Sequence, residues 1–140
     1  MDNIAFKLNK ISTQQFAVID SAYSENNEEF SVETNLGFGV DATSGLIMSL
    51  VKIQFEQEKN PFLIVEVACE FDIIEDFWSQ FTDSKQIKLP KGLMIHLAMI
   101  TIGTTRGVLH SKTENTKFNE FLLPTLNVED MIKEDGLFEK

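Results

Sequence analysis

The sequence predicts a single-domain α+β protein in which a four-stranded antiparallel sheet has a long helix and short helices packed on one face. Three observations predict this class. The first half of the chain alternates apolar and polar residues, and the second half changes to helical patterns. No segment between the alternating runs is long enough for a crossover helix, so neighbouring strands should be antiparallel. The 140 residues fit one domain, covering 1–140.

Four alternating runs predict the strands. They cover residues 4–19, with a phase shift near Lys10, then 30–40, 46–55 and 63–73. In the third run the apolar residues Leu46, Met48 and Leu50 are followed by Val51, Ile53 and Phe55 on the other parity. This change of phase predicts a β-bulge after Leu50.

The apolar period changes after Ile74. Residues 75–81 predict a short helix, and residues 83–89 a polar connector. Pro90 suits the first position of a helix, so a long helix is expected over residues 90–110.

The end of the chain predicts one more helix. Residues 112–119 are polar and indicate a loop. Asn127 is a suitable helix cap, and Glu129 and Asp130 would lie in the first turn, where the helix dipole favours acidic groups.

The long helix is apolar on nearly every side. One four-stranded sheet covers one face of such a helix, so something else must cover the rest. A second copy of the chain is the expected cover, which predicts a homo-oligomer. Its interface is expected at Leu97, Met99, Ile102 and Gly103.

Composition excludes several classes of protein. With 22 acidic and 12 basic residues the net charge is -10, so nucleic acid is not an expected partner. The N-terminus lacks the pattern of a signal peptide, and no run reaches the roughly 18 apolar residues of a membrane span. Cys69, the one cysteine, lies in an apolar run typical of a buried thiol. We expect a cytoplasmic protein that is not membrane-embedded.

Residues for catalysis are scarce. His96 and His110 are nearly four helical turns apart, too far to share a small metal site. Cys69 could meet His96 only across the sheet–helix interface. We therefore expect no catalytic residue, no cofactor and no metal, and we keep open an enzyme or small-molecule carrier that uses a sheet–helix cavity.

The surplus of phenylalanine stands out, with 12 against one tryptophan and one tyrosine. Phe77, Trp78 and Phe81 lie close together on the short helix. They either staple this helix to the sheet or form an apolar binding surface. In the second interpretation the client-binding residues are Phe71, Phe77, Trp78 and Phe81.

The order of the elements, with three short motifs, resembles the SecB family of export chaperones. The motifs are Phe-Leu-Ile-Val-Glu-Val at residues 62–67, Thr-Thr-Arg-Gly-Val-Leu at 104–109 and Leu-Pro-Thr-Leu-Asn-Val at 123–128. The resemblance implies a cytoplasmic homotetramer, a dimer of dimers with the long helices packed between the dimers. It also implies that unfolded, export-bound polypeptides bind in apolar grooves and pass to the SecA motor for translocation, without catalysis or cofactor.

Motor contacts in the family involve two acidic residues on the first strand and a Leu/Glu pair on the fourth. Ile64 and Glu66 match the second pair. Gln15 and Ile19 occupy the first-strand positions, so half of the acidic surface is missing. The resemblance therefore leaves binding of a SecA-type motor in doubt.

The sequence favours a holdase for unfolded polypeptide. Some divergent family members chaperone an antitoxin, so a dedicated chaperone of a toxin–antitoxin system is the first alternative. The enzyme or carrier is the second. Surface grooves lined by Phe and Met would favour the holdase, and a deep closed pocket lined by His96 would favour the enzyme.

Overall fold

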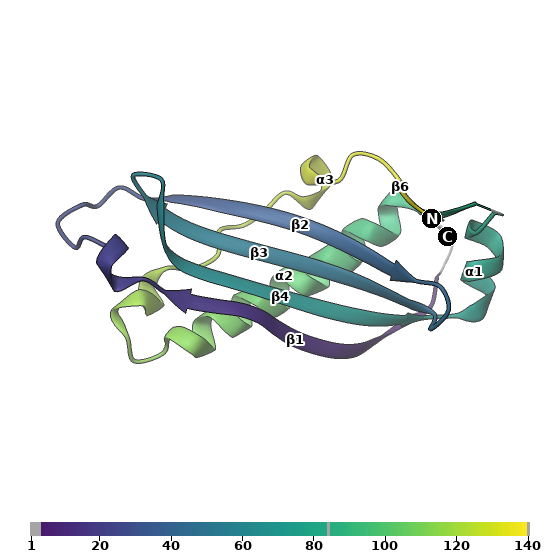
Figure 1. The fold of residues 1–140 in the computed structure, drawn as a ribbon, viewed down its shortest axis with the longest axis horizontal. Helices are drawn as coiled ribbons and strands as arrows, with labels where there is room; N and C mark the ends of the chain where they lie inside the picture. Colours follow the sequence, from purple (N-terminus) through teal and green to yellow (C-terminus); the bar gives the residue numbers. More distant parts are fainter. Residues whose placement is uncertain (1–3, 84, 140) are drawn as a thin grey trace.

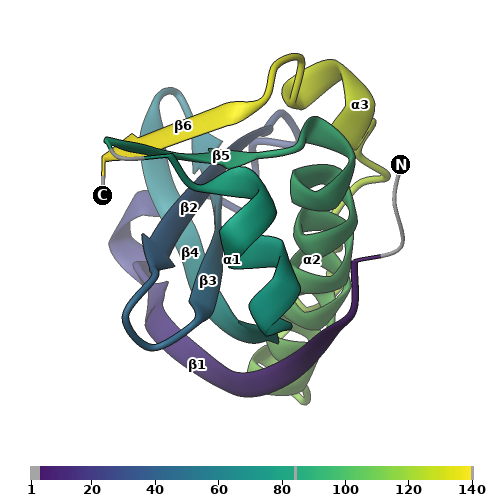
Figure 2. The ribbon, with the colours of Figure 1, turned by 90° about the vertical axis from the view of Figure 1, so that its right-hand side faces the viewer.

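The computed structural model describes residues 4–83 and 85–139 and places a four-stranded antiparallel sheet against one long helix (Figure 1). Seen along the strands, α2 and α3 lie on the same side of the sheet (Figure 2). The predicted α+β class is confirmed. The strands are β1 (Phe6–Val18), β2 (Ser31–Asp41), β3 (Leu46–Gln57) and β4 (Asn60–Ile73).

The strand order in the sheet is β1-β4-β3-β2, so β1 and β2 form its edges. β2, β3 and β4 follow one another as hairpins. The β3–β4 turn places Glu58 and Lys59 at φ 51° and 67°, the left-handed pair of a two-residue hairpin. The connection from β1 to β2 contains a short 3-10 helix, η1 (Asp20–Ala22), at one end of the sheet.

The bulge predicted after Leu50 is wrong. β3 pairs with β2 without interruption, and its register with β4 shifts between Phe55 and Glu56 instead. Leu46, Met48 and Leu50 lie on the outer face, away from α2, and that face is itself partly apolar. The shift predicted near Lys10 is confirmed, and β1 has a second shift before Gln15.

The helices largely follow the expected pattern. They are α1 (Glu75–Phe81), α2 (Lys91–Thr113) and α3 (Val128–Met131), with a 3-10 helix η2 (Lys117–Glu120) between the last two. α2 therefore extends into the loop expected from residue 112. Asn127 stands at the cap position of α3, but its side chain makes no capping hydrogen bond.

The connector expected over residues 83–89 contains a strand that the sequence did not predict. β5 (Gln86–Leu89) pairs with β6 (Gly136–Glu139) near the end of the chain. Ile87 and Leu89 of β5 are buried in the hydrophobic core. The small β5–β6 sheet brings the C-terminal segment back to the beginning of α2.

The core lies between α2 and the two central strands, β3 and β4. Three threonines of α2 are buried, namely Thr101, Thr105 and Thr113. Each hydroxyl donates to a backbone carbonyl one turn earlier. Thr101 donates to Leu97 O at 2.9 Å, and Thr105 to Thr101 O at 2.7 Å. Burial of these polar groups is therefore compatible with an otherwise apolar interface.

The C-terminal segment covers a second side of α2. Leu123, Val128 and Ile132 are buried in the same core as the helix. A second copy was the expected cover, whereas the protein's own chain provides part of it. By length and composition α2 is also apolar enough to cross a membrane, contrary to expectation, but here it is the core helix that packs on the sheet.

An aromatic cluster fixes the chain that follows α2, near the C-terminal end of that helix. Phe121 lies at its centre, with ring-centroid distances of 5.0 Å to Phe62 and 5.2 Å to Phe30. Lys117 pairs with Asp20 at 3.4 Å. The cluster comprises Tyr23, Phe30, Phe55, Phe62, Phe118 and Phe121.

Asp135 caps the beginning of α2 from a distant part of the chain. The Lys91 N–H donates to Asp135 Oδ1 at 2.7 Å, and Lys88 Nζ lies 3.3 Å from Asp135 Oδ2. The hydrogen bond from the Lys91 backbone, followed by that from Lys88, lowers the pKa of Asp135 below its ordinary value of 3.8. The charged carboxylate therefore holds β5, α2 and the C-terminal segment together.

We expect Asp135→Asn to lower the melting temperature at pH 7, because the amide keeps the hydrogen bond but loses the charge. A lowered pKa in the folded state means that the stabilisation is present above pH 3.8 and disappears as the pH falls through the folded-state value. The difference from wild type should therefore shrink in acid. Glu134→Gln, at an exposed neighbour, is the control. Equal melting temperatures of Asp135→Asn and wild type at pH 7 would contradict this role.

Candidate functional site

A groove runs between α2 and the chain that leads into α3. It has a volume of about 540 Å³ and is open to solvent. We call it the α2 groove. Its α2 wall is formed by Ile95, Met99, Ile102 and Arg106, and its other wall by Thr125, Leu126, Asn127, Val128 and Glu129.

The α2 groove is mainly apolar. Met99 is 58% exposed, a large value for an apolar side chain, and Leu126 is half-buried opposite it. Methionine is flexible and polarisable, so it adapts to side chains of different shapes. Arg106 and Glu129 add charge, and neither forms a salt bridge with another residue in 4–83 or 85–139. Such a surface is chemically suited to apolar side chains with polar backbone beside them.

Two of the four expected client-binding aromatics are buried, and the other two are half-buried. Phe71 is fully buried and Phe77 is 2% exposed, so neither presents surface to a client in this conformation. Phe81 stacks on Phe77 at 4.9 Å, and Trp78 contacts Phe77 edge-on at 5.1 Å. The structure thus supports the stapling interpretation for Phe77. Trp78 and Phe81 are half-buried, and their role in client binding stays a prediction.

The four residues expected at an oligomer interface divide into two pairs. Leu97 is fully buried against the sheet and Ile102 is 5% exposed, so the protomer itself already covers both. Met99 and Gly103 are exposed. A Cβ atom placed on Gly103 or Gly107 would meet no atom within 4 Å. This exposed side of α2 is the part that a second copy can reach.

The expected motor-contact residues do lie together on the sheet. Glu66 is directly opposite Gln15 on β1 and Lys52 on β3. Ile64 is directly opposite Ala17 and is 8% exposed. The acidic first-strand partner that the family would supply is therefore replaced by a neutral side chain next to Glu66.

The geometry gives no support to the enzyme alternative. Cys69 is fully buried, so a substrate cannot reach its thiol without opening the core. His96 is exposed on α2, where its ring packs edge-on against Phe6 at 5.1 Å. Across residues 4–83 and 85–139, no three His, Cys, Asp or Glu side chains form a metal-binding group.

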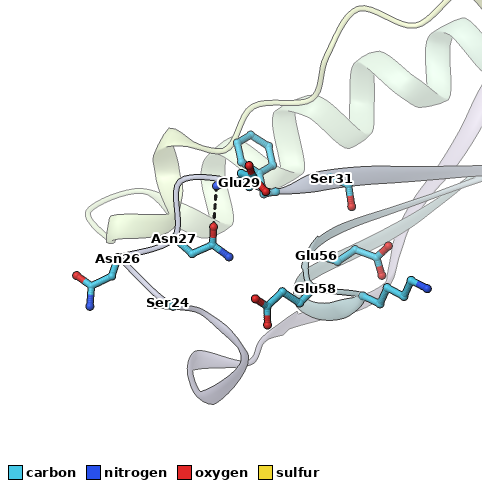
Figure 3. Close-up of a pocket in the computed structure, with 9 residues that line it drawn as sticks. Ser24, Asn26, Asn27, Glu29, Ser31, Glu56 and Glu58 are labelled. Carbon is cyan, nitrogen blue, oxygen red and sulfur yellow. Dashed lines mark hydrogen bonds between the residues drawn. The ribbon is translucent and has the colours of Figure 1, made fainter.

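A second pocket, at the beginning of β2, was not predicted from the sequence. It has a volume of about 610 Å³, and carboxylates of Glu29, Glu56 and Glu58 line it (Figure 3). Phe30 is 49% exposed there. The buried side chain of Gln57 holds the adjoining loop through its bonds to Ser24 and Asn27. In the sequence, the one indication of this pocket is that the apolar Phe30 directly follows two glutamates. Glu56 joins them only through the pairing of β2 with β3, which the local sequence does not specify.

Comparison with solved structures identifies the fold. The SecB-like chaperone Rv1957 of Mycobacterium tuberculosis, solved in complex with a ChAD peptide from the antitoxin HigA1 (Rv1956), matches 86% of this chain and 90% of its own, with a TM-score of 0.53 and 15% identity. A protein of unknown function from Streptococcus agalactiae matches 89% of this chain and 98% of its own, with a TM-score of 0.41 and 14% identity.

Sequence comparison adds nothing to the structural likeness. No family model matches the chain, and no curated protein matches its sequence. The likeness to Rv1957 extends over nearly the whole chain, and it agrees with the sheet, the long helix and the short helices described above. The chain therefore has a divergent SecB-like fold.

Proposed function

We propose that this protein is a holdase, a chaperone that binds unfolded polypeptide and prevents its aggregation. The observation that carries the proposal is the α2 groove, an open apolar surface between two elements of the core. The fold supports it, because a protein of the same fold is a chaperone solved with a bound peptide. Fully burying one large apolar side chain contributes about 1.5–3 kcal/mol, so a few client side chains in the groove give useful affinity.

A dedicated chaperone of one antitoxin is the second candidate. It is favoured by the antitoxin peptide bound to Rv1957. The two candidates differ in client range, since a general holdase suppresses the aggregation of an unrelated, slowly folding protein and a dedicated one protects its own partner alone. An aggregation-suppression assay with such an unrelated client tests the proposal. No suppression at a several-fold excess of chaperone would leave the dedicated chaperone as the better candidate.

Export is a separate part of the proposal. In a cytoplasmic holdase with this fold, Ile64 and Glu66 would contact a SecA-type motor. Gln15 provides no carboxylate beside Glu66, so the electrostatic attraction for a basic motor surface is small. We therefore propose weak coupling to the motor and a main role in holding clients.

The proposed assembly is a homo-oligomer, a dimer of dimers in which α2 packs on α2 of another copy. Gly103 and Gly107 are exposed in the protomer beside the α2 groove and leave room for a second backbone. Burial of the exposed apolar side of α2 would stabilise the contact at roughly 25 cal/mol per Å². Assembly would also place several α2 grooves in one particle, so that one unfolded chain engages more than one groove.

Leu126→Asp should weaken holdase activity, because it places a charge in the α2 groove where client side chains need an apolar surface. We expect about tenfold more protein to be required for half-suppression of aggregation. Leu122→Asp is the matched control, since Leu122 is 62% exposed on the same segment and does not line the groove. Circular dichroism should show both variants folded. Equal activity of the two variants would contradict a role of the groove.

Gly103→Trp should dissociate the proposed oligomer without unfolding the protomer. Gly103 is exposed and a Cβ atom placed on it meets no atom within 4 Å, so a side chain can point to solvent in the protomer, whereas a closely packed second helix would clash with it. Gly103→Ala is the control and should keep the native mass. Light scattering after size-exclusion chromatography measures the outcome. A wild-type monomer at micromolar concentration, or a Gly103→Trp variant of native mass, would show that α2 is not the interface.

A further inference from the structure

The two walls of the α2 groove run in opposite directions. The chain that follows α2 begins at the C-terminal end of the helix, where the Thr116 N–H donates to Thr113 O at 3.0 Å. It reaches the beginning of the helix at Asp135, which accepts from the Lys91 N–H. Figure 1 shows this segment returning along α2 to α3. The order of residues along one wall is therefore the reverse of the order along the other.

Opposite charges consequently stand at opposite ends of the groove. Arg106 is the last groove residue of α2, and it lies toward Thr125, the first residue of the facing wall. Glu129 is the last residue of that wall and lies toward Ile95, the first groove residue of α2. The helix from Ile95 to Arg106 is about 16 Å long, at a rise of ~1.5 Å per residue. The positive end and the negative end are therefore separated by roughly this length of helix.

Both charged side chains are available to a ligand. Arg106 and Glu129 are exposed, and in the described part of the chain neither forms a salt bridge. Asp130, which is also exposed and follows Glu129, adds to the negative charge of that end. Their separation along the groove keeps Arg106 and Glu129 from pairing with each other.

The middle of the groove is apolar. Met99 on α2 and Leu126 on the facing wall stand between the charged ends. Ile102 and Val128, which are 5% and 7% exposed, complete this apolar stretch. An extended chain advances ~3.3 Å per residue, so about five residues span the groove. The groove therefore matches a short apolar segment whose two ends carry opposite charges.

We propose that the α2 groove prefers client segments in which a short apolar run has an acidic residue on one side and a basic residue on the other. The acidic residue lies beside Arg106, and the basic residue lies beside Glu129. The inference rests on the proposed function and names the class of client segment that the groove takes. Either order of the two charges fits, because a segment of reversed sequence lies in the opposite direction. A segment with like charges at both ends is repelled at one of them.

Three peptides measure this preference. Each has about four leucine and valine residues between two charged residues, to match the length of the groove, and a glycine–serine tail carries the fluorophore. The charged residues are lysine and aspartate in the mixed peptide, two aspartates in the acidic peptide and two lysines in the basic peptide. Fluorescence polarisation at low salt gives each Kd. The net charge of -10 attracts every basic peptide, so variants are compared through the ratio of two Kd values.

Single charge reversals test each end. Arg106→Glu should raise the ratio of the mixed-peptide Kd to the basic-peptide Kd about fivefold or more, because the basic peptide gains the contact that the mixed peptide loses. Lys112→Glu makes the same change of charge on an exposed residue of α2 outside the groove, and it should leave this ratio unchanged. Glu129→Arg should raise the ratio of the mixed-peptide Kd to the acidic-peptide Kd in the same way, with Glu134→Arg as its control. Ratios that change as much in the controls would overturn the inference.

The double variant Arg106→Glu with Glu129→Arg exchanges the two ends and leaves the net charge of the protein unchanged. The mixed peptide should regain its wild-type Kd to within about twofold, because it lies in the reversed direction. If the single changes act only by damaging the groove, their effects add, and the double variant binds the mixed peptide more weakly than either single variant. That result would contradict the inference.

The same measurements separate this inference from the proposed function. Leu126→Asp should weaken binding of the mixed peptide, since it changes the apolar middle of the groove. A mixed peptide that binds this variant as tightly as wild type binds elsewhere, and the inference is then wrong. If wild type suppresses aggregation but shows no charge preference among the peptides, the inference fails and the holdase stands. If the charge preference and its rescue in the double variant are found but aggregation is not suppressed, the holdase proposal fails and the inference stands.

Discussion

The whole structure depends on how the apolar surface of α2 is covered. The sheet covers the face that carries Leu93, Leu97 and Thr101, and the C-terminal segment covers part of another. The cover is incomplete, because Met99 is left exposed between the two. The α2 groove is the consequence: it exists where one apolar helix meets two layers that do not close over it.

The far wall of the groove is held at both of its ends. Phe121 packs in the aromatic cluster near the end of α2, and Asp135 caps the beginning of the same helix. Residues 125–129 lie between these two anchors and make their contacts with α2 along the groove. A wall that is fixed at both ends holds the groove in place when it is empty, which suits the proposed binding of different apolar segments.

Much of the fold could be predicted from local patterns. Alternation located all four long strands, and α1 begins and ends where the change of period after Ile74 places it. The phase change at Leu50 does not mark a bulge, because β3 has apolar residues on both faces of the sheet. The alternation in the third run is therefore not that of a strand with one buried face. The order β1-β4-β3-β2 and the β5–β6 pairing depend on contacts between distant segments, which no local period encodes.

The site was harder to predict than the fold. Phe71 and Phe77 were expected at a surface, yet both are buried. Phe71 lies on the core face of β4, and the burial of Phe77 depends on how α1 docks against the sheet. Met99 was predicted at an oligomer interface, and Leu126 was not recognised as its neighbour in a groove. Their proximity follows from the return of the C-terminal segment along α2, and nothing in the local sequence of either element specifies it.

The most direct measurement of the central claim observes Met99 while a client binds. Protein labelled with ¹³C at the methionine methyl groups is titrated with a permanently unfolded polypeptide, and the methyl resonances are followed by NMR. Met131, which is 40% exposed on α3 and does not line the α2 groove, serves as the internal reference. The account predicts that the Met99 resonance shifts or broadens in a saturable way while that of Met131 stays in place. A Met99 resonance that is unchanged when the client is fully bound would contradict it.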